Sequence, residues 1–259
     1  MPKNRENAQI LVVTPTMGKR DSIKRTIDSV RKYGGEMVRH VLVCPRDKRE
    51  ELAATYQMEC IGEPEGAKGI YPALNYAFKK QGMGYRYITF INDDDYWLPA
   101  YTQLIREALD SDSQLVYGRI CCEKDGKRVD VACSGRFCDF AVLLHRGIVL
   151  SSQQATLVRP AVFFEVGGFD EHYRLVSDTK LWAQLCVKNV TYHFVDRPCA
   201  VYTCQPGQLS EDGILQLQEH RDMLRALPSF SRWVVWRAVA RFRFGNLPVY
   251  FRRWLVHHS

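Results

Sequence analysis

YITFINDDDYW, residues 87–97, is the stretch that decides the fold of this 259-residue chain. An apolar run that ends abruptly in polar residues is typical of a buried strand. Three consecutive carboxylates, Asp93 to Asp95, follow it and repel one another, so a fold that gathers them beyond a strand end needs a compensating cation. Oxygen ligands of this type suit Mg²⁺ or Mn²⁺. A second interpretation is a solvated turn that caps a helix starting at Pro99, and spacing alone does not choose between the two.

Strand and helix patterns alternate on both sides of this segment. Ile10 to Val13 is a short apolar run that ends in Thr14-Pro-Thr16, and Asp21 then precedes apolar residues at helical spacing. Further strands are expected at 41–43 and 115–117, and further helices around 73–78 and 99–109. This alternation predicts an α/β fold with a mainly parallel sheet. Ligands of such sheets bind beyond the carboxyl ends of the strands, where residues 14–16 and 92–95 fall.

The pattern is looser from about Ser151. Residues 153–164 are expected to form a strand and a short helix, and Gly167-Gly168 breaks the chain. Asp178 then precedes apolar residues at helical spacing, which predicts a helix that this carboxylate could cap. A further helix is expected at 214–227, and an Arg- and Trp-rich tail follows it.

Composition limits the class of protein. With 46% hydrophobic residues the chain can bury a large core. The N-terminus is polar and does not resemble a secretory signal. The sequence has no run of about 18 apolar residues, so no membrane-spanning helix is predicted. A cytoplasmic protein is therefore expected. The nine cysteines include no C-x-x-C pair, which indicates neither a zinc site nor a disulfide framework.

The net charge of +7 is concentrated in the tail. Residues after Asp222 include seven arginines and no Asp, Glu or Lys, which leaves 29 basic and 29 acidic residues in the first 222. An apolar stripe runs along this tail, and tryptophans flank it; the stripe consists of Val235, Ala238, Val239 and Phe242. This pattern predicts a helix on an anionic membrane surface. There are two alternatives: the stripe packs on the body of the protein, or the tail binds nucleic acid. No nucleic-acid partner is expected.

The order of the motifs resembles glycosyltransferase family 2, with its GT-A fold, over roughly residues 8–212. The segments that carry the resemblance are Val12-Val-Thr-Pro-Thr16 with Arg20, Glu63-Pro-Glu65 with Gly69-Ile-Tyr-Pro-Ala-Leu-Asn75, Phe90-Ile-Asn-Asp-Asp-Asp-Tyr96, Gly167-Gly-Phe-Asp-Glu171 with Asp178, and Gln208-Leu-Ser210. Each motif is weak alone, but their common order is specific.

The resemblance implies a three-layer α/β/α GT-A domain at 1–212 and a C-terminal helical extension at 213–259. It implies an inverting, metal-dependent transfer from a nucleotide-diphosphate sugar, expected to be a UDP-sugar, to a hydroxyl of a glycan acceptor. The expected acceptor is a lipid-linked saccharide of a surface-polysaccharide pathway, at the inner face of the cell membrane. A sugar-phosphate nucleotidyltransferase and a non-catalytic nucleic-acid-binding protein remain the alternatives.

The resemblance also assigns roles to individual residues. Asp178 is the expected base, and Asp95 with Asp93 is expected to hold Mn²⁺ or Mg²⁺. The acceptor side is expected to include Asp170, Glu171 and Trp182. The residues expected to bind the nucleotide sugar are Thr14, Pro15, Thr16, Arg20, Asp47, Glu65, Asn75, Asp93 and Asp94. Cys44-Pro-Arg-Asp47 departs from the family's Asp-Asp-Gly-Ser pattern, so either Asp47 or Glu65 is expected to recognise the base.

Overall fold

A computed structural model describes residues 8–205, 208 and 213–258 of the chain. Strands and helices alternate through the first 110 residues, as the sequence predicts. The strands are β1 (Ile10–Pro15), β2 (Val38–Cys44), β3 (Cys60–Gly62), β4 (Tyr87–Phe90), β5 (Tyr96–Trp97), β6 (Leu115–Lys124), β7 (Lys127–Asp130), β8 (Thr156–Val158) and β9 (Tyr192–Cys204). The helices are α1 (Ile23–Gly34), α2 (Arg49–Tyr56), α3 (Ile70–Gln81), α4 (Tyr101–Asp110), α5 (Phe140–Leu144), α6 (Pro160–Glu165), α7 (Ser177–Val187), α8 (Gly213–Arg225), α9 (Arg232–Gly245) and α10 (Leu247–His258).

One sheet organises the described part of the chain, with strand order β3-β2-β1-β4-β8-β6-β9-β5 and β7 on the edge of β6. The strands β3, β2, β1 and β4 are parallel, and β6 and β9 are parallel over a long register. The remaining pairings, β4 with β8, β8 with β6, β6 with β7 and β9 with β5, are antiparallel. The prediction of a mainly parallel sheet is therefore correct for the first half of the chain and wrong for the second.

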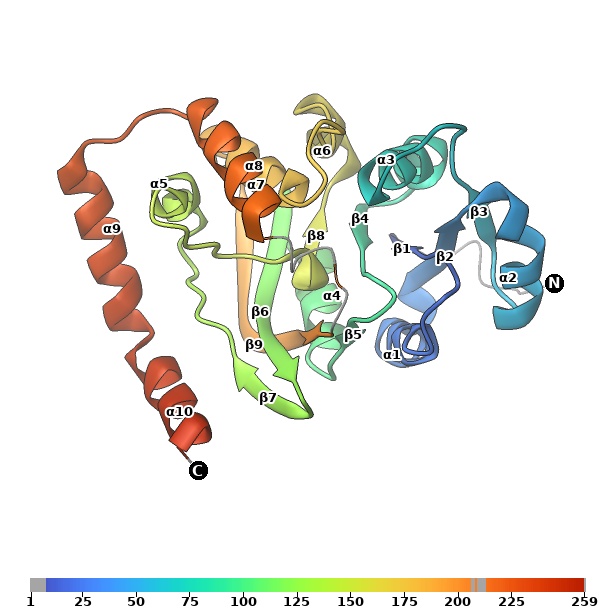
Figure 1. Ribbon diagram of the computed structural model, residues 1–259, viewed down its shortest axis with the longest axis horizontal. Helices are drawn as coiled ribbons and strands as arrows, with labels where there is room; N and C mark the ends of the chain where they lie inside the picture. Colours follow the sequence, from blue (N-terminus) through green and yellow to red (C-terminus); the bar gives the residue numbers. More distant parts are fainter. Residues whose placement is uncertain (1–7, 206–207, 209–212, 259) are drawn as a thin grey trace.

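Helices cover both faces of the sheet, which gives the predicted three-layer arrangement (Figure 1). On one face α3, α6 and α7 pack over a core that includes Leu74, Phe163 and Leu181. On the other face α1 and α4 pack through residues such as Val30 and Leu104. The apolar spacing of each helix explains this, because residues three and four apart share one side of a helix.

One helix and one strand differ from the sequence interpretation. Helix α1 is preceded by Ser22 and not by Asp21, and no side chain caps it. The long strand β9 was not predicted, because its residues 192–204 alternate weakly and include Pro198. Strand β9 matters for the site, since it pairs with β6 and ends beside the acidic triplet.

The C-terminal helices pack on the body at one end of the molecule (Figure 1). Val235, Ala238 and Phe242 are buried in the same core as α5 and α7. Asn246, between α9 and α10, is buried, and its side-chain oxygen accepts a 3.1 Å hydrogen bond from the backbone of Cys133. The apolar stripe therefore faces the protein, which is the alternative the sequence left open, and not a membrane. None of the described helices is both long enough and apolar enough to cross a bilayer.

Candidate active site

A cavity of about 920 Å³ opens at the carboxyl ends of β1 and β4. Distant parts of the sequence contribute to its wall: the loop after β1, the loop after β4, the start of α3, the segment before α7, β9 and α10. Six of the residues that the sequence assigned to a catalytic, metal or donor site line this cavity: Pro15, Thr16, Arg20, Asp93, Asp94 and Asp178. The sequence argument that strand ends would bring these loops together is confirmed.

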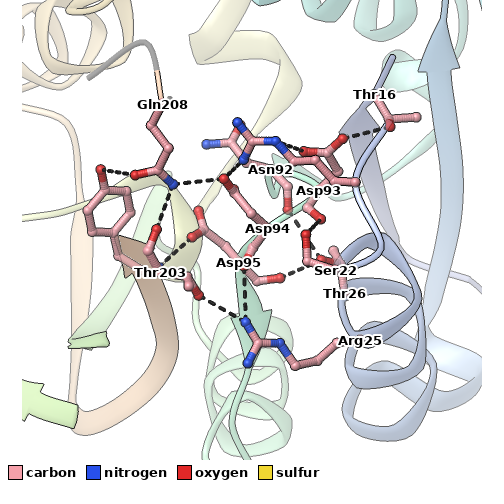
Figure 2. A network of polar contacts seen from close by, with 12 residues as sticks. Thr16, Ser22, Arg25, Thr26, Asn92, Asp93, Asp94, Asp95, Thr203 and Gln208 are labelled. Carbon is pink, nitrogen blue, oxygen red and sulfur yellow. Dashed lines mark hydrogen bonds and ion pairs between the residues drawn. The ribbon is translucent and has the colours of Figure 1, made fainter. Parts of the chain in front are cut away.

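The acidic triplet is held by polar partners from three elements (Figure 2). The Asp93 carboxylate accepts a 2.7 Å hydrogen bond from the Thr16 hydroxyl, which ties it to the loop after β1. The Asp94 carboxylate forms an ion pair with Arg20 and accepts a 2.8 Å hydrogen bond from the Gln208 amide. Both carboxylates line the cavity.

Asp95 lies behind the cavity wall and is fully buried. One carboxylate oxygen accepts a 2.9 Å hydrogen bond from the backbone of Thr203, and the other accepts a 2.7 Å hydrogen bond from Gln154. Burial raises the pKa of Asp95 to about 6, although these hydrogen bonds oppose the shift. Asp95 therefore joins β9 to the acidic loop, and the sequence did not indicate this structural role.

The triplet has the chemistry of a divalent-cation site. Three carboxylates share one loop, and Arg20 is the cation paired with them. Oxygen donors and an excess of negative charge fit Mn²⁺ or Mg²⁺. Within the described residues, however, no group of three or more His, Cys, Asp or Glu side chains converges on one point. Asp93 and Asp94 are the donors that face the cavity, whereas the Asp95 oxygens already accept hydrogen bonds.

Asp178 faces the same cavity from the first turn of α7. Its carboxylate accepts hydrogen bonds from the backbone of Thr179 at 2.7 Å and from the Tyr71 hydroxyl at 3.3 Å. Burial raises the pKa of Asp178 above the ordinary value of an aspartate. The residue before the helix is Val176, so Asp178 does not occupy the cap position considered from the sequence. A partly desolvated carboxylate with a raised pKa is suited to accept a proton.

A second carboxylate, Glu219 of α8, fixes the segment that leads to Asp178. It is buried and accepts hydrogen bonds from three consecutive backbone N–H groups, those of Arg174 at 2.7 Å, Leu175 at 2.8 Å and Val176 at 3.2 Å. These groups lie just before the N-terminus of α7, where an anion is favoured. Sequence reasoning missed Glu219, because the 43 or more residues that separate it from its partners give no local signal.

The comparisons with known proteins agree with this geometry. The profile described as glycosyl transferase family 2 matches residues 11–169, which is more than half of the chain. The chain belongs to glycosyltransferase family 2. It is therefore a glycosyltransferase enzyme. A search of curated protein sequences found no match.

Solved glycosyltransferases share the fold of this family 2 chain at low sequence identity. TarS 1–349 of S. aureus, in complex with UDP-GlcNAc, aligns with a TM-score of 0.68 at 13% identity, over 90% of this chain and 71% of TarS. The mannosyltransferase PcManGT of Pyrobaculum calidifontis, with GDP-Man and Mn²⁺, gives 0.61 at 14% identity, over 95% and 73%. Glucosyl-3-phosphoglycerate synthase of Mycobacterium tuberculosis, with Mn²⁺, UDP and phosphoglyceric acid, gives 0.59 at 16% identity, over 87% and 81%. The GT-A fold expected from the sequence is confirmed.

Other residues assigned to the donor site lie outside the cavity of this glycosyltransferase. The Thr14 hydroxyl is buried against His40 at 2.8 Å, and the pKa of His40 is lowered to about 3 by burial. Asp47 and Glu65 are exposed and do not line the cavity, whereas Glu63 does. Burial raises the pKa of Glu63, and Asp47 adds to the shift through its charge. Of these three acidic residues, only Glu63 lines the cavity.

Asn75 stabilises a turn in place of the predicted contact with a nucleotide. Its side chain exchanges two hydrogen bonds with the backbone of Phe169, of 2.7 and 3.0 Å. Gly168 adopts a φ of +71°, and a Cβ there would lie 3.0 Å from the Asn75 oxygen. This turn needs glycine for both reasons.

The predicted acceptor-side residues also lie outside the cavity lining. Trp182 is a core residue, and Asp170 forms an ion pair with Lys180. Glu171 is exposed and accepts a 3.0 Å hydrogen bond from Asn75. The contact of these three residues with an acceptor stays a prediction. Of the predicted loop 208–210, Gln208 bonds to Asp94, while Leu209 and Ser210 lie outside the described residues.

Proposed function

We propose that this glycosyltransferase inverts the anomeric centre of a nucleoside-diphosphate sugar as it moves the sugar to an acceptor hydroxyl. The observation that carries the proposal is that one cavity is lined by Thr16, by Asp93 and Asp94 of the acidic triplet, and by Asp178. A donor and an acceptor can meet there between a cation-binding loop and a base. The finer assignments are a UDP-sugar donor and a lipid-linked glycan acceptor of a surface-polysaccharide pathway.

The donor is proposed to lie along the loop after β1. Pro15 and Thr16 line this end of the cavity, and Arg20 and Glu63 add charged and hydrogen-bonding groups. The structural neighbours that bind UDP, UDP-GlcNAc and GDP-Man support a nucleotide donor of this type. Glu63 is the residue proposed to contact the base or ribose, in place of Asp47 and Glu65.

The proposed chemistry is one displacement. The acceptor oxygen forms a bond to the anomeric carbon as the bond from that carbon to the diphosphate oxygen breaks. Asp178 takes the proton of the attacking hydroxyl, and Tyr71 and the Thr179 amide orient its carboxylate. Arg20 can exchange its partner Asp94 for the departing phosphate, because a guanidinium binds both kinds of oxyanion.

A divalent ion is the proposed cofactor, and Asp93 and Asp94 are the ligands that face the cavity. Such an ion supplies electrostatic stabilisation of the charge that grows on a leaving diphosphate. Mn²⁺ occurs with the nucleotide in two of the similar structures, which supports this assignment. Asp95, predicted as the main ligand, is proposed to shape the loop and to contribute an oxygen only if the Gln154 or Thr203 hydrogen bond is exchanged.

The membrane surface is a proposed partner of the outer side of α9 and α10. Although the apolar stripe is buried, large aromatic side chains on the opposite side are more than half exposed: Trp233, Trp236, Phe244, Phe251 and Trp254. Arginines of the tail lie on the same two helices. Aromatic rings beside cations suit the interface of an anionic leaflet, which would bring a lipid-linked acceptor to the enzyme.

The proposal is tested by offering the protein a set of nucleotide sugars with Mn²⁺ and glycan acceptors and measuring release of nucleoside diphosphate. We expect one donor to be used, and nuclear magnetic resonance of the product to show the inverted anomeric configuration. A product that retains the donor's configuration would refute the single displacement. The transfer of a nucleotidyl group, with release of pyrophosphate, would favour the alternative activity.

A further inference from the structure

Helix α10 returns to the active-site cavity and places Arg253 in its wall. Arg253 lies at the end of the cavity formed by β6 and β9, where Cys122 and Tyr202 also line the wall. Burial raises the pKa of Cys122 to about 12, and the positive charge of Arg253 acts against that shift. This electrostatic interaction agrees with a guanidinium close to the end of β6.

The guanidinium of Arg253 has no anionic partner among the described residues. Its Nε is buried without a hydrogen-bond acceptor, and no ion pair between residues that the structure describes involves this side chain. The neighbouring Arg252 differs, because its side chain is 72% exposed and lies 3.4 Å from Asp130. Arg20, a cation at the other end of the cavity, is paired with Asp94. Arg253 is thus a cavity cation whose charge is available to a ligand, and a partly buried unpaired cation favours an anion.

The position of Arg253 separates it from the proposed nucleotide site. In the sheet order, β1 to β3 lie on one side of β4, and β6 and β9 lie on the other. Arg20 and Glu63 follow β1 and β3, the acidic triplet follows β4, and Arg253 contacts the cavity beside β6 and β9. A donor that runs from the base site to the triplet therefore leaves the Arg253 end of the cavity to the acceptor.

We propose that Arg253 binds a phosphate group of the acceptor, so that the C-terminal helix forms part of the acceptor site. A guanidinium presents a planar fork of N–H donors that matches a phosphate oxyanion. The inference rests on the proposed function, since it names the class of acceptor: a hydroxyl compound that carries a phosphomonoester or phosphodiester. It also gives α10 a role beyond contact with lipid.

The test compares Arg253→Ala with Arg252→Ala. Both substitutions remove one charge from adjacent positions of α10, but only Arg253 lines the cavity. The probe is glycerol 1-phosphate, and its binding to each protein is measured by calorimetric titration. Saturating UDP and Mn²⁺ are present, so that the donor side of the cavity is occupied. We expect Arg253→Ala to weaken binding of the probe roughly tenfold, as loss of a charge-assisted pair predicts, with Arg252→Ala unchanged. Arg253→Lys should recover part of the affinity, and the melting temperature of each variant checks that it is folded.

A titration of UDP alone separates the two sources of phosphate. If Arg253→Ala weakens UDP binding and leaves glycerol 1-phosphate binding unchanged, the side chain belongs to the donor site and the inference is wrong. It is equally wrong if both variants lose the same affinity for the probe, or if the wild-type protein does not bind it. Failure of the wild-type protein to bind UDP or any other nucleoside diphosphate would instead refute the proposed function, and glycerol 1-phosphate can still be titrated without nucleotide.

Discussion

At the scale of single residues, the carboxylates around the cavity differ in what satisfies their oxygens. Asp95 accepts hydrogen bonds on both oxygens from protein groups, whereas Asp94 pairs with the side chain of Arg20. Among the described residues, Asp178 accepts hydrogen bonds on one oxygen only. The other oxygen of Asp178 is therefore the one available to a substrate proton. These differences, and not the residue type, separate a structural carboxylate from a reactive one.

Replacement of Asp178 by asparagine tests its role as the base. Asparagine has nearly the same size and can still accept the Thr179 and Tyr71 hydrogen bonds, but it cannot take a proton at neutral pH. We expect turnover to fall by roughly 10²-fold or more, with the affinity for nucleotide nearly unchanged. Steady-state kinetics and a nucleotide titration measure the two effects. Near-normal turnover in this variant would exclude Asp178 as the base.

The same substitution has a predicted effect on stability that depends on pH. Since burial raises the pKa of Asp178 in the folded state, folding is increasingly penalised as the pH rises above the ordinary pKa of an aspartate, and the penalty is complete above the raised pKa. Asp178→Asn removes the penalty, so the variant should be more stable than the wild type at neutral pH. The difference should shrink as the pH falls through the raised pKa, and it should vanish below the ordinary pKa of an aspartate. Chemical unfolding at several pH values measures this, and a variant that is less stable at every pH would contradict it.

At the scale of elements, the start of helix α7 depends on a carboxylate from another helix. Glu219→Ala would leave the backbone N–H groups of Arg174, Leu175 and Val176 without an acceptor. We expect a loss of about 2–4 kcal/mol in the free energy of unfolding, because these donors are bonded to a charged group. The stability of Glu219→Gln should lie between those of the wild type and Glu219→Ala. Gln218→Ala, at an exposed position of the same helix, should have little effect on stability. Equal stability of the Glu219→Ala and Gln218→Ala variants would contradict this account of α7.

The elements show what the sequence could and could not predict. Apolar spacing located β1, α1, β4 and α4, because each buries one side against its neighbours. It placed residues 14–16 and the acidic triplet at one edge of the sheet, because strand ends converge, whereas Asp178 was assigned from the family resemblance. It could not predict that Asn75 bonds to a turn, because side-chain direction depends on packing between elements distant in sequence. The sequence could not predict that Arg253 lines the cavity for the same reason, because the tertiary fold sets the path of α10 back to the cavity.

At the scale of the whole molecule, the C-terminal helices have one side buried against the body and one side exposed. Val235, Ala238 and Phe242 belong to the common core, so removal of α9 would expose that core to water. The opposite side carries exposed aromatic residues, and these can be changed without disturbing the core. This arrangement allows the proposed membrane contact to be tested separately from folding.

We predict that the full chain sediments with anionic vesicles and is only partly released by salt. The arginines give the salt-sensitive part, at roughly 1 kcal/mol for each one close to the leaflet. The aromatic rings give the part that persists in salt. Replacement of Trp236, Phe244 and Phe251 by serine should remove that second part while the melting temperature stays unchanged. Met83→Ser, an equally exposed position on the body, is the control. Unchanged sedimentation of the triple variant would refute a membrane role for this surface.

The central claim is that the acidic triplet holds a cation and a nucleoside diphosphate in the cavity, and calorimetric titration tests it most directly. UDP, GDP, ADP, CDP and TDP are titrated with Mn²⁺ and with a chelator into the wild-type protein and into Asp94→Asn and Asp95→Asn. We predict that at least one nucleotide, UDP first, binds more tightly with Mn²⁺, and that Asp94→Asn abolishes this dependence. A dependence lost only in Asp95→Asn would move the main ligand to Asp95. If no nucleotide binds with Mn²⁺, or if binding is the same with chelator in all three proteins, the claim is contradicted.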